Sequence, residues 1–197
     1  AKFVNATFNA PEGDYALWDY STKAMTFEGC TFNISGKGVN VYVEAANADK
    51  DVTRTVAVNN CTVNSSAEGK AFLNIKNSTQ SYDVTLSGRN TVTGLAKDST
   101  TGSELYQVET TEVTETTGNP VTVKQENTAG EFETIYEVKK TEKAYVAEVK
   151  GVKYETLQAA IDAAARNATV TMLADTRENV TISTNYLTLD LNGHTLN

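Results

Sequence analysis

Short runs of alternating apolar and polar residues recur along this chain, and several of them share one nine-residue pattern. Its third and eighth positions are apolar, its seventh is Thr and its ninth is Asn. Alternation with a period of two is typical of strands with one buried face. Four segments fit the pattern, and a looser fifth has one extra residue: 1–9, 25–33, 56–64 and 189–197, with 84–92 as the fifth.

The first copies begin 24, 31 and 28 residues apart, at residues 1, 25, 56 and 84. These intervals exceed a β-hairpin repeat and suit one turn of a coil that has three strands and variable loops. A second motif follows the first, as GKGVNVYV from Gly36 and GKAFLNIK from Gly69, with 14–20 as the expected counterpart in the earliest turn. The repeat therefore predicts an all-β fold built on a right-handed parallel β-helix.

The ninth position of the pattern is Asn in all four good copies. Asn tolerates left-handed backbone conformations and bonds locally through its side chain. A structural corner ladder is therefore expected, with a ligand-contacting role as the alternative, at Asn9, Asn33, Asn64 and Asn197.

The two cysteines, Cys30 and Cys61, occupy the same position of the motif. Neighbouring strands lie about 4.7–4.9 Å apart, which falls within the Cα separation that a disulfide allows. The sequence leaves open a stacked pair of buried thiols, which we favour, and a disulfide. Two Cys and one His cannot complete a zinc site without carboxylates, so no metal site is expected.

The motif is lost between residues 100 and 150. There, segments 121–126 and 131–138 flank a four-residue turn and predict a β-hairpin, as a small β module or a cap. The only predicted helix follows at 157–166, with Thr156 as its N-cap and Asn167 closing it. This short amphipathic helix is expected to cover the open end of a β-helix.

The last fifty residues carry a more specific signal. Residues 153–164 (KYETLQAAIDAA) are followed by ATVTMLAD, NVTIS and LTLDLNGHTL, the last spanning 187–196. This order resembles a segment common in large surface proteins of gut Firmicutes, where it opens a pectate-lyase-like right-handed β-helix. The N-terminal repeats match that fold class more loosely. The resemblance implies an extracellular, cell-surface protein.

Four regions are expected: β-helix rungs at 1–99, a β-rich hairpin or cap at 100–150, a capping helix segment at 151–168, and opening rungs at 169–197. The first nine and the last nine residues of the chain each carry one complete copy of the motif. Either the chain passes from one β-helix into the next of a tandem array, or the opening rungs stack with the N-terminal rungs. The second arrangement predicts parallel pairing of the C-terminal strand with an N-terminal strand, within one molecule or end to end between chains.

The formal net charge of −8 limits the classes of binding partner that are expected. Nucleic-acid binding needs a basic face, and anionic lipid attracts basic segments, so neither partner is expected. No apolar run approaches the roughly 18–20 residues that cross a bilayer, so no membrane insertion is expected. Residue 1 does not look like a natural start, and we expect a segment of a longer protein.

Pectate-lyase-like folds often host polysaccharide lyases and glycoside hydrolases, but the fold alone does not establish an activity. The acidic residues of the predicted rungs do not share a column, and His194 takes the motif position of Cys30, which suggests a structural place. Neither a Ser-His-Asp set, nor a Gly-rich phosphate loop, nor HExxH is present. No catalytic residue and no cofactor is therefore expected; a partial or degenerate lyase or hydrolase is the alternative.

A binding surface is the remaining candidate. If Leu17, Val41 and Ile75 stack inward, the following residues Trp18, Tyr42 and Lys76 share an outward column, and exposed Trp and Tyr suit sugar stacking. The alternative is that Trp18 points inward or is covered by a loop. The candidate glycan-stacking residues are Trp18, Tyr42, Tyr15 and Tyr20.

The sequence thus predicts a non-catalytic extracellular module of a bacterial surface protein, stalk-like or adhesin-like, whose partner is a carbohydrate or a host surface protein. A self-assembling structural repeat, joined through open strand edges, is a further alternative.

Overall fold

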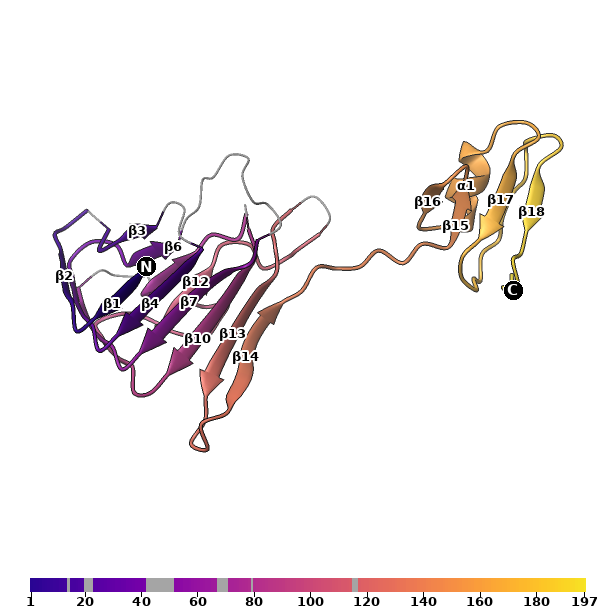
Figure 1. Ribbon diagram of the computed structural model, residues 1–197. Helices are drawn as coiled ribbons and strands as arrows, with labels where there is room; N and C mark the ends of the chain where they lie inside the picture. Colours follow the sequence, from indigo (N-terminus) through magenta and orange to yellow (C-terminus); the bar gives the residue numbers. More distant parts are fainter. Residues whose placement is uncertain (14, 20–22, 42–51, 67–70, 79, 115–116) are drawn as a thin grey trace. The chain divides into compact units, whose positions relative to one another are not determined.

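The computed structural model describes residues 1–13, 15–19, 23–41, 52–66, 71–78, 80–114 and 117–197 (Figure 1). The chain forms two compact units, Ala1–Thr141 and Glu142–Asn197, and each is described by itself. Strands dominate both. The one helix of the described residues is α1 (Leu157–Ala163), in the C-terminal unit.

In the N-terminal unit the chain passes through three sheets in turn and repeats the circuit. The sheet orders are β1-β4-β7-β10-β13-β14, β2-β5-β8-β11 and β3-β6-β9-β12, and every pairing is parallel except β13–β14. The strands are β1 (Lys2–Val4), β2 (Thr7–Ala10), β3 (Trp18–Asp19), β4 (Ala24–Glu28), β5 (Thr31–Ile34), β6 (Val39–Val41), β7 (Arg54–Asn59), β8 (Thr62–Ser65), β9 (Leu73–Ile75), β10 (Tyr82–Ser87), β11 (Thr91–Thr93), β12 (Tyr106–Val108), β13 (Val121–Glu126) and β14 (Phe132–Val138).

The register of the first two sheets is the one that the nine-residue pattern predicts. Phe3 pairs with Phe27, and Phe27 with Val58. On the next sheet Phe8 pairs with Phe32. The extra residue in the fifth copy leaves the register intact, because Thr91 still pairs with Thr62. Matching motif positions therefore stack directly on one another.

Apolar side chains from the three sheets meet in one core. Phe27, Phe32 and Phe72 are fully buried. The ring of Phe32 lies 5.2 Å from that of Phe27 and 4.6 Å from that of Phe72, measured between centroids. Alternation along β4 and β5 puts Phe27 and Phe32 on the inner face and turns their Thr and Asn neighbours outward, so the outer faces are free to carry other chemistry.

At the corner between the first and second sheets, successive turns of the chain alternate between Asn and Gly. Asn5 and Asn60 adopt φ values of 52° and 51°, and Gly29 and Gly88 both have φ of 61°. Only Gly and Asn enter this left-handed region readily. The side chain of each Asn leans over the Gly of the next turn, where a Cβ atom would collide with it.

The predicted hairpin is confirmed. β13 and β14 pair antiparallel, so the parallel sheet ends on a strand of opposite direction. In the connecting turn Asn127 Oδ1 accepts hydrogen bonds from the backbone N–H groups of Ala129 and Glu131, both at 3.0 Å.

The C-terminal unit has its own sheet and core. The sheet order is β16-β15-β17-β18, with β15 (Ala147–Val149), β16 (Val152–Tyr154), β17 (Thr169–Met172) and β18 (Thr188–Asp190). α1 contacts β15, β16 and β17, and buries Leu157, Ala160 and Ile161. Thr156 caps the helix as predicted, because its Oγ1 accepts from the N–H of Ala159 at 3.2 Å. The boundary between the units falls inside the region 100–150, which the sequence treats as one piece.

A carboxylate that the sequence does not single out also holds the start of α1. Glu178 accepts hydrogen bonds from Leu157 N at 3.0 Å, Gln158 N at 3.2 Å and Thr176 Oγ1 at 2.8 Å. Burial acts to raise the pKa of Glu178, but these hydrogen bonds outweigh it and hold the pKa below its usual value.

Within the C-terminal unit β18 pairs with β17, and Leu189 packs on the core around α1. The pairing of the C-terminal strand with an N-terminal strand stays a prediction. The predicted strand at 179–183 is absent, because the backbone N–H and C=O groups of Thr181 both bond to the side chain of Gln158.

Candidate functional site

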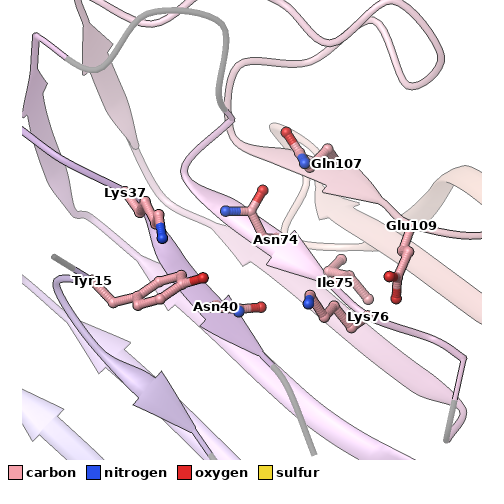
Figure 2. Close-up of a pocket in the computed structure, with 8 residues that line it drawn as sticks. All are labelled: Tyr15, Lys37, Asn40, Asn74, Ile75, Lys76, Gln107 and Glu109. Carbon is pink, nitrogen blue, oxygen red and sulfur yellow. The ribbon is translucent and has the colours of Figure 1, made fainter. Parts of the chain in front are cut away.

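A hollow of about 210 Å³ lies on the outward face of the sheet β3-β6-β9-β12 (Figure 2). Three side-chain amides from three neighbouring strands point into it. We call it the amide groove, and its lining residues are Tyr15, Lys37, Asn40, Asn74, Ile75, Lys76, Gln107 and Glu109.

Strand alternation explains why the amides gather there. On β6 the buried Val39 and Val41 flank Asn40, and on β9 the buried Leu73 and Ile75 flank Asn74. Burying the two flanking residues turns the middle one outward. The strands pair in register, so that Trp18, Asn40, Asn74 and Gln107 form one outward column.

This column corrects the predicted glycan-stacking set. The sequence places Trp18 beside Tyr42, but Trp18 pairs with Asn40. Tyr15 bridges Lys37, which shifts this strand from the predicted register. Asp19, and not Leu17, therefore pairs with Val41. Tyr20 and Tyr42 lie outside the described residues.

Tyr15 lines the groove, and we call Tyr15 and its neighbour Trp18 the aromatic mouth. Trp18 points outward, which is one of the two arrangements that the sequence leaves open; it is 51% exposed, and its ring lies 5.3 Å from that of Tyr15. Lys37 Nζ sits 4.5 Å above the centre of the Tyr15 ring, a cation–π contact that holds the ammonium at the rim. The two aromatics provide an amphipathic edge next to a polar floor.

The floor of the groove contains two oxygen atoms that have no hydrogen-bond partner among the described residues. These are Asn40 Oδ1 and Asn74 Oδ1, and both are buried. Asn40 as a whole is 2% exposed. A buried acceptor left unsatisfied costs about 1–3 kcal/mol, so native structures seldom retain one. Two such acceptors lie in register here, which makes the groove a candidate binding site.

The second asparagine ladder, on the sheet β2-β5-β8-β11, behaves differently. Asn33 Nδ2 donates to Asn9 Oδ1 at 2.9 Å, and Asn64 Nδ2 donates to Asn33 Oδ1 at 3.1 Å. Three of the four predicted ladder residues are therefore joined to one another. The fourth, Asn197, belongs to the C-terminal unit and donates its backbone N–H to Thr176 O at 3.0 Å.

The far side of the groove is fixed by hydrogen bonds. Gln107 Oε1 accepts from the N–H of Ala71 at 3.2 Å, and Glu109 Oε2 accepts from the hydroxyl of Ser78 at 3.2 Å. Because the Gln107 oxygen is used, its NH₂ group is the part that remains for a ligand.

Asn77 is a buried residue that the sequence does not mark as important. It is fully buried, and its NH₂ group donates to Thr110 O at 2.8 Å and Asn119 O at 2.7 Å. Its Oδ1 accepts from Thr110 N at 2.9 Å. One side chain thus joins the segment after β9 to the two segments that precede β13.

Arg54 is a second buried polar residue that the sequence does not mark as important. It is 2% exposed, and its Nε donates to Gln80 Oε1. Nearby, burial raises the pKa of Tyr82 well above its usual value, although the Arg54 charge acts against this. This group lies at the end of the core next to β7 and β10.

Cys30 and Cys61 are buried free thiols. The Cys30 thiol lies 3.5 Å from both Phe3 O and Glu28 O, and the Cys61 thiol 3.4 Å from Asn59 O. Burial raises the pKa of Cys61 above its usual value, which disfavours the reactive thiolate.

We therefore expect the thermal midpoint of unfolding to be the same with and without reductant. We also expect a thiol reagent such as DTNB to label both cysteines only after denaturation. Differential scanning calorimetry and labelling kinetics measure these effects, and a midpoint that falls in reductant would contradict the free-thiol assignment.

Other candidate groups do not assemble into a second site. His194 Nδ1 lies 3.4 Å from Asp175 Oδ1 in the C-terminal unit. In the described part of the chain, no three His, Cys, Asp or Glu residues lie close enough to hold a metal ion. Among the same residues, no helix has the length and hydropathy needed to cross a membrane.

The amide groove thus combines an aromatic mouth, two unsatisfied acceptors and a fixed far side on one rigid sheet. Comparison with known proteins adds no family to this geometry: no family model matches the chain, and no match is found among the curated proteins or the solved structures.

Proposed function

We propose that this chain is a non-catalytic segment of an extracellular bacterial surface protein and that it binds carbohydrate in the amide groove. Three parallel sheets visited in strict rotation support a right-handed parallel β-helix for the N-terminal unit. The resemblance of residues 153–196 to surface proteins of gut Firmicutes supports the location. The fold then serves as a stiff scaffold, and the groove serves as its adhesive site.

The observation that carries the binding proposal is the contrast between the two asparagine ladders. Asn9, Asn33 and Asn64 satisfy one another through their side chains. Asn40 and Asn74 have the same in-register stacking, yet in the part of the chain that the structure describes their side-chain oxygen atoms have no hydrogen-bond partner. Stacked asparagines in this chain are therefore able to close a ladder, and the open one is a property of the groove.

Carbohydrate fits this combination of groups. A sugar ring has an apolar face for the aromatic mouth and several hydroxyl donors for the floor. Lys37 and the NH₂ group of Gln107 offer donors to sugar ring and hydroxyl oxygens. The sheet beneath is held by parallel pairing on both sides of β6 and β9, so little ordering is required when the ligand binds.

The test is a titration with neutral, acidic and N-acetylated oligosaccharides, followed by Trp18 fluorescence and by isothermal calorimetry. Trp18 is the single Trp of the chain and lies at the mouth, so a bound sugar is expected to change its emission. We expect Asn74→Ala to weaken binding by about 5–30-fold, which corresponds to one hydrogen bond to a buried acceptor of about 1–2 kcal/mol.

Asn33→Ala is the matched control, because it removes the same side chain from the closed ladder on another sheet. It should leave the affinity unchanged. Equal losses in the two variants would point to a general effect on the fold, and the absence of any response to the whole panel would refute carbohydrate binding in the groove.

A further inference from the structure

Two sheet edges of this chain carry the same nine-residue motif. β1 and β2 are edge strands of the N-terminal unit, and β18 is an edge strand of the C-terminal unit. Edge strands offer unpaired backbone groups to another chain. We propose that residues 189–197 of one copy stack in parallel on residues 1–9 of a second copy, so that copies of the chain join end to end.

The backbone groups of the two units have the same hydrogen-bonding phase. In the N-terminal unit the seventh motif position donates to the preceding turn, because Thr31 N donates to Ala6 O at 2.8 Å. In the C-terminal unit the ninth position does so, because Asn197 N donates to Thr176 O at 3.0 Å. Alternate residues of a strand bond to the same side. The seventh and ninth positions therefore face the preceding turn in both units, and the eighth faces the following turn.

This phase makes the two edges complementary. The backbone N–H and C=O groups of Leu196, at the eighth position, point away from Thr176, which is its bridge partner. The N–H groups of Thr7 and Asn9, at the seventh and ninth positions, point away from β5. Leu196 of one copy can thus bond to Thr7 and Asn9 of the next copy in the pattern that already joins the turns of the N-terminal unit.

The apolar positions of the motif are incompletely covered at both edges. The third position is fully buried at Phe27, which has a turn on each side. At the edges it is half-buried as Phe3 and 43% exposed as Leu191. The eighth position is half-buried as both Phe8 and Leu196. Stacking sets Leu191 on Phe3 and Leu196 on Phe8, and so extends the two apolar columns of the core.

The asparagine ladder has a direction that fits the same joint. In each step the Nδ2 of the later turn donates to the Oδ1 of the earlier turn, from Asn64 to Asn33 and from Asn33 to Asn9. A further step back needs an acceptor for Nδ2 of Asn9. Asn197 carries an amide oxygen at that motif position.

The corner and the charges match as well. Gly193 stands in line with Asn5, and both have positive φ, which continues the alternation of Gly and Asn along the N-terminal unit. The second motif position brings Asp190 opposite Lys2, and opposite charges on neighbouring strands attract.

The connection between the units is too short for this joint to form within one chain. The joint would place β15 three strand spacings beyond β1, in the order β15-β17-β18-β1, while β14 lies five spacings from β1 on the other side. Eight spacings amount to about 38 Å. Val138, at the end of β14, and Ala147, at the start of β15, are joined by a segment that spans at most about 32 Å when fully extended. The partner is therefore a second copy.

The first experiment uses the full chain with Asn9→Cys and Asn197→Cys together. Stacking places these two Cα atoms about 4.7–4.9 Å apart, within the range that a disulfide allows. The native thiols are buried. Under mild oxidation we expect a series of disulfide-linked oligomers on a non-reducing gel, because each copy offers one edge of each kind. Asn33→Cys with Asn197→Cys is the matched control: Asn33 lies one turn further from the joint, and no linked oligomers are expected.

The second experiment is sedimentation velocity of the unmodified chain over a concentration series. The mass should rise above the 21.3 kDa of one copy as the concentration increases. Leu191→Lys puts a charge into the joint and should raise the concentration needed for association at least about tenfold, because burying one Leu contributes more than a single tenfold step. Val152→Lys is its control, since Val152 is a 56% exposed residue of β16, at the opposite edge of the same sheet.

Three results would overturn the proposal. They are a mass that stays at 21.3 kDa at every concentration, equal cross-linking of the two cysteine pairs, and equal effects of the two Lys variants. A disulfide that closes within one chain would also overturn it. Carbohydrate binding in the amide groove does not depend on any of these outcomes.

Discussion

Phe32→Ala is expected to destabilise the N-terminal unit by about 3–5 kcal/mol, which is the usual cost of emptying a buried Phe site. Phe32 is fully buried, and its ring contacts the rings of three neighbours. The centroid separations are 4.7 Å to Phe8, 4.6 Å to Phe72 and 5.2 Å to Phe27. These partners come from three successive circuits of the chain, so no single side chain can move in to fill the space.

Urea denaturation followed by Trp18 fluorescence measures this loss, because the only Trp of the chain belongs to the N-terminal unit. Phe132→Ala is the matched control: the same change is made at a ring that is 48% exposed on β14. It should cost below about 1 kcal/mol. Similar midpoints for the two variants would show that Phe32 is not in the core described above.

Asn77→Ala is expected to cost about 3 kcal/mol or more. It deletes three side-chain hydrogen bonds, each with a net contribution of about 1 kcal/mol, and leaves partly buried backbone groups of Thr110 and Asn119 without these partners. The chain between β12 and β13 depends on these bonds, so the variant should also speed hydrogen exchange at the N–H of Thr110.

Asn33→Ala is again the informative comparison. It removes two hydrogen bonds, but they lie on an exposed face where water can replace them, so a loss below about 1 kcal/mol is expected. Denaturation curves and amide exchange measured on both variants test the difference. If Asn33→Ala proves as costly as Asn77→Ala, burial is not what makes the amide of Asn77 important.

The sequence was sufficient to predict the register of two sheets. The pattern that aligns Phe8, Phe32 and Val63 depends on side-chain direction, and direction alternates strictly along a strand. The hairpin β13–β14 and the Thr156 cap were predictable for a similar reason, since both are set by residues close in sequence.

The third sheet was harder to predict, and the groove lies there. Its strands are two or three residues long, so the alternation is too short to fix the register. Asp19 occupies an inward position that the pattern would assign to an apolar residue. The signal that could have found the groove is the pair Asn40 and Asn74, each flanked by apolar residues, but only the pairing of β6 with β9 shows that they stack.

The buried polar residues were missed because their partners are distant in sequence. Asn77 bonds to residues 33 and 42 positions away. Arg54 bonds to Gln80, which is 26 positions away. No local pattern distinguishes such residues from exposed ones.

The alternating corner of Asn5, Gly29, Asn60 and Gly88 bears on how such a gene can lengthen. Duplicating one turn that has Asn at this corner would set Asn over Asn, and an Asn side chain would then meet a Cβ atom in the space that a Gly leaves open. Duplicating one turn that has Gly there would set Gly over Gly and leave the contact with the Asn side chain unmade. Duplicating two turns together keeps every Asn over a Gly. Expansion of the N-terminal unit by internal duplication is therefore favoured in steps of two turns.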